Sequence, residues 1–189
     1  NVSYTVEANN GVLRIAYLKV RGYDTDGEEV YSGLAAIRQS AASVAVSGYY
    51  KKVTSTDDIS NGQYLIVYET GNVAFNGGLD TLDAVSNTIA VAIESESGKI
   101  MATEATNNAA FAIDVTAGTL KSASGEYIGV SSNSNGLKQS EDADTYTHTF
   151  SIDKDDNAVI AAVFDGSTMT LKFNKASNQD RFRYYKSGQ

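Results

Sequence analysis

Alternation between apolar and polar residues recurs along this chain, and it constrains the fold more than any other feature of the sequence. It is clear in stretches such as "VSYTVEA" (2–8) and "LRIAYLKVRGY" (13–23), which are rich in β-branched and aromatic residues. Clusters of Asn, Gly, Asp and Ser separate these stretches. A period of two residues is typical of strands, and helical periodicity is hard to find. The sequence therefore predicts an all-β fold.

The first 40 residues are predicted to form three strands. Two alternating stretches are followed by "TDG" (25–27), and "EEVYSGLAAIRQ" (28–39) then runs back. Asp–Gly tolerates the positive φ of a tight hairpin turn. Three strands are marginal by themselves, and open sheet edges have to be paired or covered. We expect this segment to need the rest of the chain or a partner, for which strand-mediated homodimerisation is a candidate.

The small, polar stretch "SAASVAVSG" (40–48) is the predicted linker between two domains, residues 1–46 and 49–189. In the second domain, "QYLIVYE" (63–69) is the strongest candidate for a core strand, and "KIMATEATNNAA" (99–110) is a candidate for a short helix.

One pattern in the second domain recurs. "FAID" at 111–114 and "FSID" at 150–153 each open a β-run, a glycine turn and a second β-run, and residues 60–77 resemble a more degenerate copy. Phe111 and Phe150 lie 39 residues apart. A repeat of this length in an all-β chain fits a β-trefoil-like barrel. Residues 79–110 do not fit the repeat, so an irregular β-barrel or a sandwich remains an alternative.

Composition excludes several kinds of chemistry. The chain has no cysteine and one histidine, His148, which excludes disulfides, thiolate sites and a zinc site built from several imidazoles. Its net charge of −8 disfavours nucleic-acid binding and attachment to anionic membrane surfaces. No apolar run is long enough for a membrane span. A Ser-, Thr-, Asn-, Gly- and Tyr-rich acidic chain is typical of secreted or cell-surface β-proteins, with any targeting segment expected outside this sequence.

Acidic loops are the only candidates for a metal site. "YDTDGEEVY" (23–31) carries Asp24, Asp26, Glu28 and Glu29, which resemble the start of a calcium loop, but Gly27 comes too early for an EF-hand. "DKDDN" (153–157) is similarly acidic. "SEDADTYTH" (140–148) is instead an acidic loop beside Tyr146 that could accept hydrogen bonds from sugar hydroxyls, with an exposed loop as the alternative. Because Asp and Asn favour turns, we interpret these stretches as solvated turns and expect neither metal nor cofactor.

Catalysis has little support in the sequence. His148 lies in an alternating stretch, and no GxSxG elbow accompanies it. A glycosidase needs two carboxyl groups facing each other across a cleft, whereas the acids here cluster in predicted loops. No phosphate-binding glycine loop is present. We therefore expect a protein that is not an enzyme.

Two stretches resemble modules of secreted Bacteroidetes proteins. Residues 2–43, with "VSYTV", Asn9, Asn10, "RIAYLKV" and "AIRQSAA", resemble the C-terminal half of the immunoglobulin-like BACON domain. Residues 49–189, with "SNGQYLIVYE", "GLDTLDAVSNTIAV", "SASGEYIG" and "LKFNKASNQDRFRYYKS", are similar to β-rich C-terminal modules of the same group. The resemblance implies a partial immunoglobulin-like segment (1–46) and a non-catalytic surface module that is presumed to bind glycans. It implies no specific ligand residues.

Tyrosines are the best candidates for ligand contacts, because each offers an apolar face and a polar tip. Our candidate ligand-binding residues are Tyr127, Tyr146, Arg183 and Tyr185. In "DRFRYYK" (180–186), alternation predicts that Phe182 and Tyr184 face inward and that Arg183 and Tyr185 face outward.

The hypothesis from sequence is a carbohydrate-binding or adhesion accessory module, which binds a glycan or a surface macromolecule. A structural spacer without a ligand and a secreted hydrolase are the alternatives.

Overall fold

The computed structural model describes residues 18–23, 29–35 and 48–186, and the chain divides into two units at Val44 and Ala45. In the first unit, β1 (Leu18–Tyr23) and β2 (Glu29–Ala35) form an antiparallel pair with Leu18 opposite Ala35. Strands on either side of the "TDG" turn therefore pair as predicted. The turn itself, the expected first strand (2–8) and Asp24, Asp26 and Glu28 lie outside the described residues.

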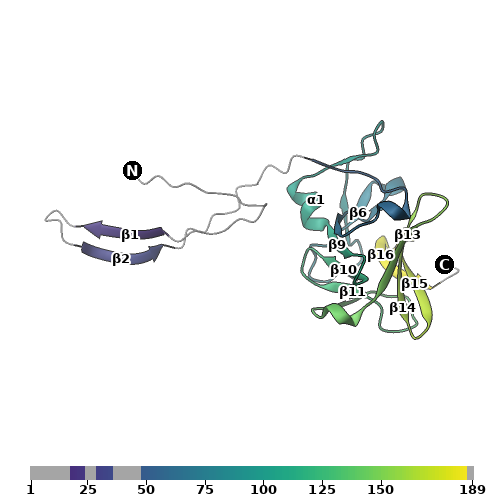
Figure 1. Cartoon of the computed structure of the whole chain (residues 1–189). Coiled ribbons are helices and arrows are strands. Elements are labelled where there is room, and N and C mark those ends of the chain that lie inside the picture. The colour runs from purple at the N-terminus through teal and green to yellow at the C-terminus, as the bar shows by residue number, and fades with distance from the viewer. Residues whose placement is uncertain (1–17, 24–28, 36–47, 187–189) are drawn as a thin grey trace. The chain divides into compact units, whose positions relative to one another are not determined.

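The second unit contains most of the described strands, and the predicted all-β class is confirmed (Figure 1). In Figure 1, β9, β10 and β11 lie on one side of this unit, β13, β14 and β15 lie on the other, and β16 lies between them. The elements are β3 (Tyr49–Tyr50), η1 (Thr56–Asp58), β4 (Gly62–Tyr64), β5 (Val67–Tyr68), η2 (Glu69–Gly71), β6 (Val73–Phe75), β7 (Thr88–Ala90), β8 (Ile100–Met101), α1 (Glu104–Ala109), β9 (Phe111–Asp114), β10 (Thr119–Ser122), β11 (Tyr127–Gly129), β12 (Lys138–Ser140), η3 (Ala143–Thr145), β13 (His148–Ile152), β14 (Ala158–Phe164), β15 (Ser167–Asn174) and β16 (Arg181–Lys186).

The strands of this unit form open antiparallel sheets. Their orders are β12-β11-β10-β9-β4, β13-β14-β15-β16, β5-β6-β7 and β3-β8. Within residues 48–186 none of these sheets closes on itself, so the expected closed barrel is not what the described residues form. Each sheet has an open edge at both ends, and β4, β5 and β13 are among the strands that end a sheet.

The repeated "FxID" motif has a clear local role. Each motif ends a strand, β9 or β13, and its aspartate caps the turn that follows. Asp114 Oδ1 accepts hydrogen bonds from the backbone N–H groups of Thr116 and Ala117, both at 2.9 Å. Asp153 Oδ1 accepts equivalent bonds from Asp155 and Asn157, also at 2.9 Å. These bonds stabilise the ionised carboxylates and hold the pKa of each aspartate below its usual value.

The second copy of the repeat continues into a tight hairpin. Asp165 and Gly166 connect β14 to β15, and both have positive φ, 48° and 70°. An Asp–Gly pair suits this turn because it relieves the steric penalty of the left-handed region. The prediction of two β-runs around a glycine turn is confirmed here, and so is the interpretation of "DKDDN" as a turn.

The predicted core strand "QYLIVYE" is instead divided between two sheets. Tyr64 pairs with Phe111 in the five-stranded sheet, whereas Val67 pairs with Ala74 in the three-stranded sheet. Tyr64, Ile66 and Tyr68 pack against the main core, while Leu65 and Val67 pack against a smaller cluster around Ala74, Val91 and Ile100. Successive apolar side chains of this stretch therefore pack against two different clusters, and the stretch is not one continuous strand.

Helix α1 forms where the short helix is predicted. Thr103 caps it, since its hydroxyl accepts from the Thr106 N–H at 3.2 Å and the Thr106 hydroxyl accepts from the Thr103 N–H at 2.8 Å. This reciprocal pair is a capping box.

The main core lies between the five-stranded and four-stranded sheets and includes Phe75, Phe111, Met169 and Tyr184, all fully buried. In the described residues no helix is long and apolar enough to cross a membrane.

Candidate ligand-binding pocket

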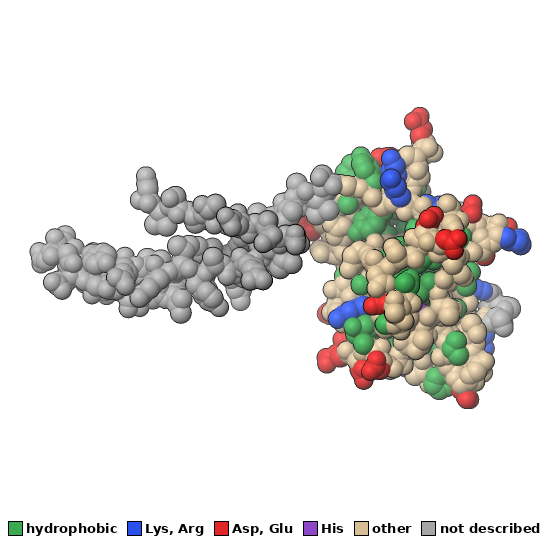
Figure 2. Space-filling model, in the orientation of Figure 1, with side chains coloured by type: hydrophobic (Ala, Val, Ile, Leu, Met, Phe, Trp, Pro, Cys, Tyr) green, Lys and Arg blue, Asp and Glu red, His purple; other side chains and the backbone are tan. Residues whose placement is uncertain are grey.

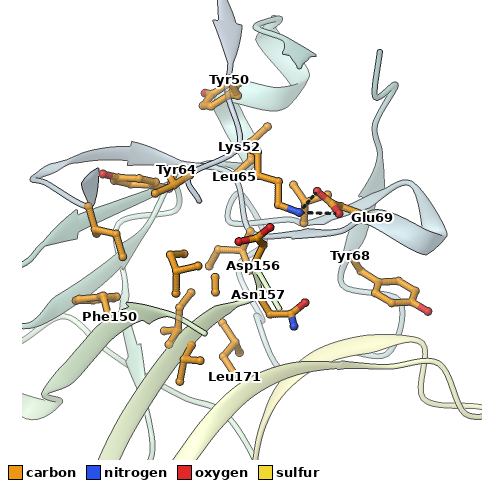
Figure 3. A pocket seen from close by; sticks show the side chains of 18 of the residues that line it. Tyr50, Lys52, Tyr64, Leu65, Tyr68, Glu69, Phe150, Asp156, Asn157 and Leu171 are labelled. Carbon is orange, nitrogen blue, oxygen red and sulfur yellow. Dashed lines mark hydrogen bonds and ion pairs between the residues drawn. The ribbon is translucent and has the colours of Figure 1, made fainter. Parts of the chain in front are cut away.

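A pocket of about 540 Å³ opens into the second unit between the β4–β5 segment and strands β13, β14 and β15 (Figure 3). We call it the large pocket. It brings together two parts of the chain that lie far apart in sequence, residues 50–70 and 150–173. Three strands that each end a sheet, β4, β5 and β13, contribute residues to its lining. Its volume falls within the usual range for small-molecule sites, roughly 300–1,000 Å³.

The walls of the large pocket are mostly aliphatic and aromatic. Ile113, Ile160, Leu171 and Phe182 line the pocket and are buried members of the main core, and we call the part that these buried residues line the inner part. Closer to solvent the walls are half-buried side chains, namely Tyr50, Ile59, Tyr64, Leu65, Ile66, Val67, Tyr68, Ile93, Phe150, Ile152 and Phe173. On the face shown in Figure 2, green apolar side chains are exposed among red and blue charged ones.

The aromatic side chains at the pocket are held in place by neighbours. Tyr64 Oη donates to the Ser60 carbonyl at 2.7 Å and accepts from the Ser60 N–H at 3.0 Å, so its ring orientation is fixed. The rings of Tyr68 and Phe173 stack with centroids 4.6 Å apart. The Tyr50 hydroxyl donates to Asn107 Oδ1 at 2.6 Å, and burial raises its pKa. The rings therefore form a preorganised wall, in which the hydroxyls of Tyr50 and Tyr64 are already bonded to the protein.

Charged and polar side chains lie at the mouth of the pocket. Lys52 Nζ contacts the two carboxylate oxygens of Glu69 at 3.0 and 3.1 Å. Figure 3 shows this pair on the opposite side of the pocket from Phe150 and Leu171. Asp156 adopts φ of 60°, a conformation that Asp and Asn tolerate, and Asn157 Nδ2 donates to the Asp153 carboxylate. All four mouth residues, Lys52, Glu69, Asp156 and Asn157, are exposed.

A second, small pocket of about 160 Å³ lies between the 131–138 segment and β16. It contains Arg183, one of the residues predicted to contact ligand. Arg183 Nη2 donates to Asp83 Oδ2 at 2.7 Å, in an ion pair whose side chains are 25% and 24% exposed. Asp83 Oδ2 also accepts from the Leu137 N–H at 3.4 Å. The arginine that was predicted to contact ligand is therefore paired with a carboxylate of this protein.

The three predicted tyrosines lie outside both pockets. Tyr146 is only 8% exposed, because its ring lies directly over Gly129, where an added Cβ would approach Tyr146 Cγ to 2.4 Å. Its hydroxyl donates to the Gln139 carbonyl at 3.2 Å, and burial is the main cause of its raised pKa. Tyr185 is also 8% exposed, and its hydroxyl accepts from Asn174 Nδ2 at 3.0 Å. Little of either ring is accessible to a ligand.

Tyr127 is half-exposed, and the Lys121 ammonium lies 4.9 Å from its ring centroid. Of the four predicted residues, only Arg183 and Tyr185 lie together, because both belong to β16. The structure does not bring the four into one site. The prediction that Phe182 and Tyr184 face inward is confirmed by exposures of 3% and 0%. Tyr185, predicted to face outward, is buried as well, so both faces of β16 are covered at this position.

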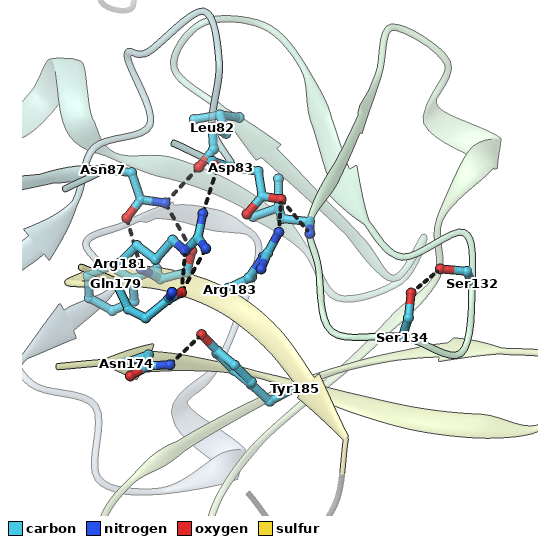
Figure 4. Close-up of polar contacts among 12 residues, drawn as sticks. Leu82, Asp83, Asn87, Ser132, Ser134, Asn174, Gln179, Arg181, Arg183 and Tyr185 are labelled. Atoms are coloured by element: carbon cyan, nitrogen blue, oxygen red, sulfur yellow. Dashed lines mark hydrogen bonds and ion pairs between the residues drawn. The ribbon is translucent and has the colours of Figure 1, made fainter. Parts of the chain in front are cut away.

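Near the start of β16, a cluster of polar side chains lies between this strand and residues 82–87 (Figure 4). Asn87 is fully buried, and its amide bonds the backbone of two segments. Its Nδ2 donates to the carbonyls of Leu82 at 2.6 Å and Phe182 at 2.9 Å, while its Oδ1 accepts from the Phe182 N–H at 2.8 Å. Arg181 Nη1 donates to the Asp83 carbonyl at 3.3 Å. We call Asn87, Asp83, Arg181 and Arg183 the Asn87 cluster.

His148 is buried behind β16 rather than exposed in a site. Its Nδ1 lies 3.3 Å from the Gly118 carbonyl, which can only accept, so Nδ1 carries the proton and Nε2 accepts from Tyr184 Oη at 2.7 Å. Desolvation lowers the pKa of His148 to about 4. Burial likewise raises the pKa of the fully buried Tyr184. The imidazole is therefore a neutral core group with both ring nitrogens occupied.

The large pocket was not among the predicted sites. Tyr50, Tyr64 and Tyr68 belong to the tyrosines that sequence reasoning favours as a class, but the pocket depends on contacts across about a hundred residues of sequence. Within the residues that the structure describes, no three His, Cys, Asp or Glu side chains are grouped as metal ligands. Comparison with protein-family models, with curated proteins and with solved structures finds no match to this chain.

Proposed function

We propose that this protein is a non-catalytic binding module of a secreted or cell-surface protein, and that the large pocket binds carbohydrate. The observation that carries this proposal is the combination of a preorganised aromatic and aliphatic wall with carboxylate, amide and ammonium groups at the mouth. The resemblance of residues 2–43 to BACON domains and of residues 49–189 to surface modules supports the same conclusion.

A sugar ring matches this arrangement chemically. Its C–H face packs on aromatic rings, and Tyr64 and Phe150 provide such surfaces in the pocket wall. Its hydroxyls both donate and accept hydrogen bonds, so they can bond the carboxylates of Glu69 and Asp156 and the amide of Asn157. Such sites bind through a few polar contacts at the edge of an apolar wall.

Several observations support a binding role over a hydrolytic one. The single histidine is buried, and its nitrogens are bonded to Tyr184 and Gly118. The carboxylates of Asp114 and Asp153 cap turns at strand ends. At the pocket mouth, the carboxylate of Glu69 is held in an ion pair with Lys52.

Glycan-array binding of the full chain tests the proposal. Ala158 is exposed at the start of β14 and lines the large pocket, so Ala158→Trp should block it. Ala90→Trp, at an exposed position on β7 that does not line the pocket, is the matched control. We expect the wild type and Ala90→Trp to retain the same glycans and Ala158→Trp to lose them.

If no glycan is retained by the wild type even at millimolar concentration, the carbohydrate proposal is wrong, and the spacer without a ligand becomes the better account. Binding that survives Ala158→Trp would place the ligand elsewhere in the molecule.

A further inference from the structure

We propose that the ligand is a sugar that carries a hydrocarbon substituent, such as an acyl, alkyl or aryl group, and that this substituent occupies the inner part of the large pocket. This inference rests on the proposed carbohydrate function. It names the ligand class more closely, because it assigns the sugar to the mouth and the hydrocarbon to the interior.

The first support is the division of polarity with depth. Ile113, Ile160 and Leu171, each 6% exposed, and Phe182, 3% exposed, line the inner part. The charged residues that line the pocket, among them Lys52, Glu69 and Asp156, are instead exposed. The chemical character of the pocket therefore changes from polar to apolar between its mouth and its interior.

A second support comes from the cost of desolvation. A sugar ring pushed into the interior would lose water from its hydroxyls among side chains that offer no hydrogen bonds, which is unfavourable. A hydrocarbon group in the same place would bury apolar surface on both partners, which is favourable. The lining thus discriminates between the two halves of such a ligand and fixes its orientation.

The third support is that the interior is open although it belongs to the core. Ile160 and Leu171 are members of the same apolar cluster as the fully buried Met169 and Phe111. At the other end of β14, Ala162 is 1% exposed and packed within this cluster. The apolar surface at Ile160 is therefore continuous with the core and accessible from the pocket, which is the arrangement that an apolar ligand completes.

The experiment is a calorimetric titration of the full chain with a homologous series of alkyl β-glycosides, methyl to octyl, each below its critical micelle concentration. We expect affinity to rise about fourfold for each added methylene until the interior is filled, with a heat-capacity change that becomes more negative with chain length. In Ala158→Trp the dependence on chain length should disappear. Ala90→Trp should preserve it.

A second arm uses alkanols and alkyl carboxylates of the same chain lengths, which carry no sugar. We expect them to bind more weakly than the matched glycosides, because they lack the contacts at the mouth. Ser151→Phe, another substitution in the pocket lining, repeats the blocking test if Ala158→Trp folds poorly.

The outcomes separate this inference from the proposed function. One outcome is that affinity stays the same along the alkyl series, while plain oligosaccharides bind the wild type and do not bind Ala158→Trp. That result would overturn the inference and leave the carbohydrate function intact. Alkanols that bind as tightly as the glycosides, with a silent glycan array, would overturn both and leave an apolar site without a sugar specificity.

Discussion

The Asn87 cluster and the large pocket border the same core but differ in structure, since the first is built around a hydrogen-bonded buried amide and the second is an open cavity. At the Asn87 cluster, a fully buried amide bonds the backbone of Leu82 and Phe182 (Figure 4). At the pocket, core residues such as Ile160 and Leu171 line a cavity of about 540 Å³ (Figure 3). Phe182 belongs to both regions, since its backbone is bonded by Asn87 and its side chain lines the pocket.

This difference suggests that the two regions have different roles. The buried Asn87 amide tolerates little change, because it bonds three backbone groups and each lost bond leaves an unsatisfied group. The Asn87 cluster is not fully bonded, since among the described residues Asp83 Oδ1 and Arg183 Nε are buried without a hydrogen-bond partner. A region in which apolar surface faces a cavity loses few contacts when the cavity is filled or lined differently. Substitutions should therefore change stability at the Asn87 cluster and ligand binding at the pocket.

Asn87→Ala should produce the largest loss of stability. It removes the hydrogen-bond partner of the Phe182 N–H and of two carbonyls, all in the buried interior. We expect the free energy of unfolding to fall by about 3–5 kcal/mol, measured by urea denaturation at pH 7. Asn61→Ala, which removes an exposed side-chain bond to the Val115 N–H, is the control and should cost under about 1 kcal/mol. A similar small loss for both would contradict the role assigned to the Asn87 cluster.

Stability should also depend on pH through His148. Because the folded protein holds the pKa at about 4, below the value of 6.5 for an unperturbed histidine, the unfolded chain takes up a proton first as pH falls. The stability present above pH 6.5 should decline by about 3 kcal/mol by pH 4, as RT ln 10 per pKa unit requires.

His148→Gln supplies the control, since its side chain does not titrate and can still accept from Tyr184. The difference in unfolding free energy between wild type and variant should change between pH 6.5 and 4. Turn aspartates such as Asp114 have lowered pKa values in both proteins, so their contribution cancels in this difference. A difference that is constant with pH would mean that His148 is not buried as a neutral group.

Two ion pairs allow the two regions to be compared directly. Asp83 and Arg183 in the Asn87 cluster are 24% and 25% exposed, whereas Lys52 and Glu69 at the pocket mouth are 41% and 54% exposed. Alanine double-mutant cycles should give a coupling energy of about 1 kcal/mol for the first pair and below about 0.5 kcal/mol for the second. Both couplings should shrink in 1 M NaCl, and equal couplings would remove this distinction between the regions.

Local features of this fold could be predicted from sequence. The repeated "FxID" motif predicted two β-hairpins, and the structure shows why the aspartate recurs, because it caps the turn after β9 and after β13. The short helix, the all-β class and the inward orientation of Phe182 and Tyr184 follow from equally local signals. Alternation and turn chemistry act over a few residues, so they are visible in the sequence.

The contacts that define the site are not local. The apolar run in "QYLIVYE" could not reveal that Tyr64 joins one sheet and Val67 another. Nothing around Asn87 marks it as buried, because its partner Phe182 lies 95 residues away. Tyrosine is equally suited to a core and to a ligand site, so only the position of Gly129 beneath Tyr146 shows that this ring is packed inward.

The smallest change in stability should follow from filling the pocket. Ala158 and Ala162 belong to the same strand, β14, but Ala158 is exposed to the pocket and Ala162 is 1% exposed in the core. Ala158→Trp should change the free energy of unfolding by less than about 0.5 kcal/mol, because the ring enters open space. Ala162→Trp should cost about 1–3 kcal/mol or more, because the core has no room for it. Urea denaturation of both variants measures the contrast.

Equal losses would show that the pocket is as tightly constrained as the core, and that its shape is maintained for stability rather than for a ligand.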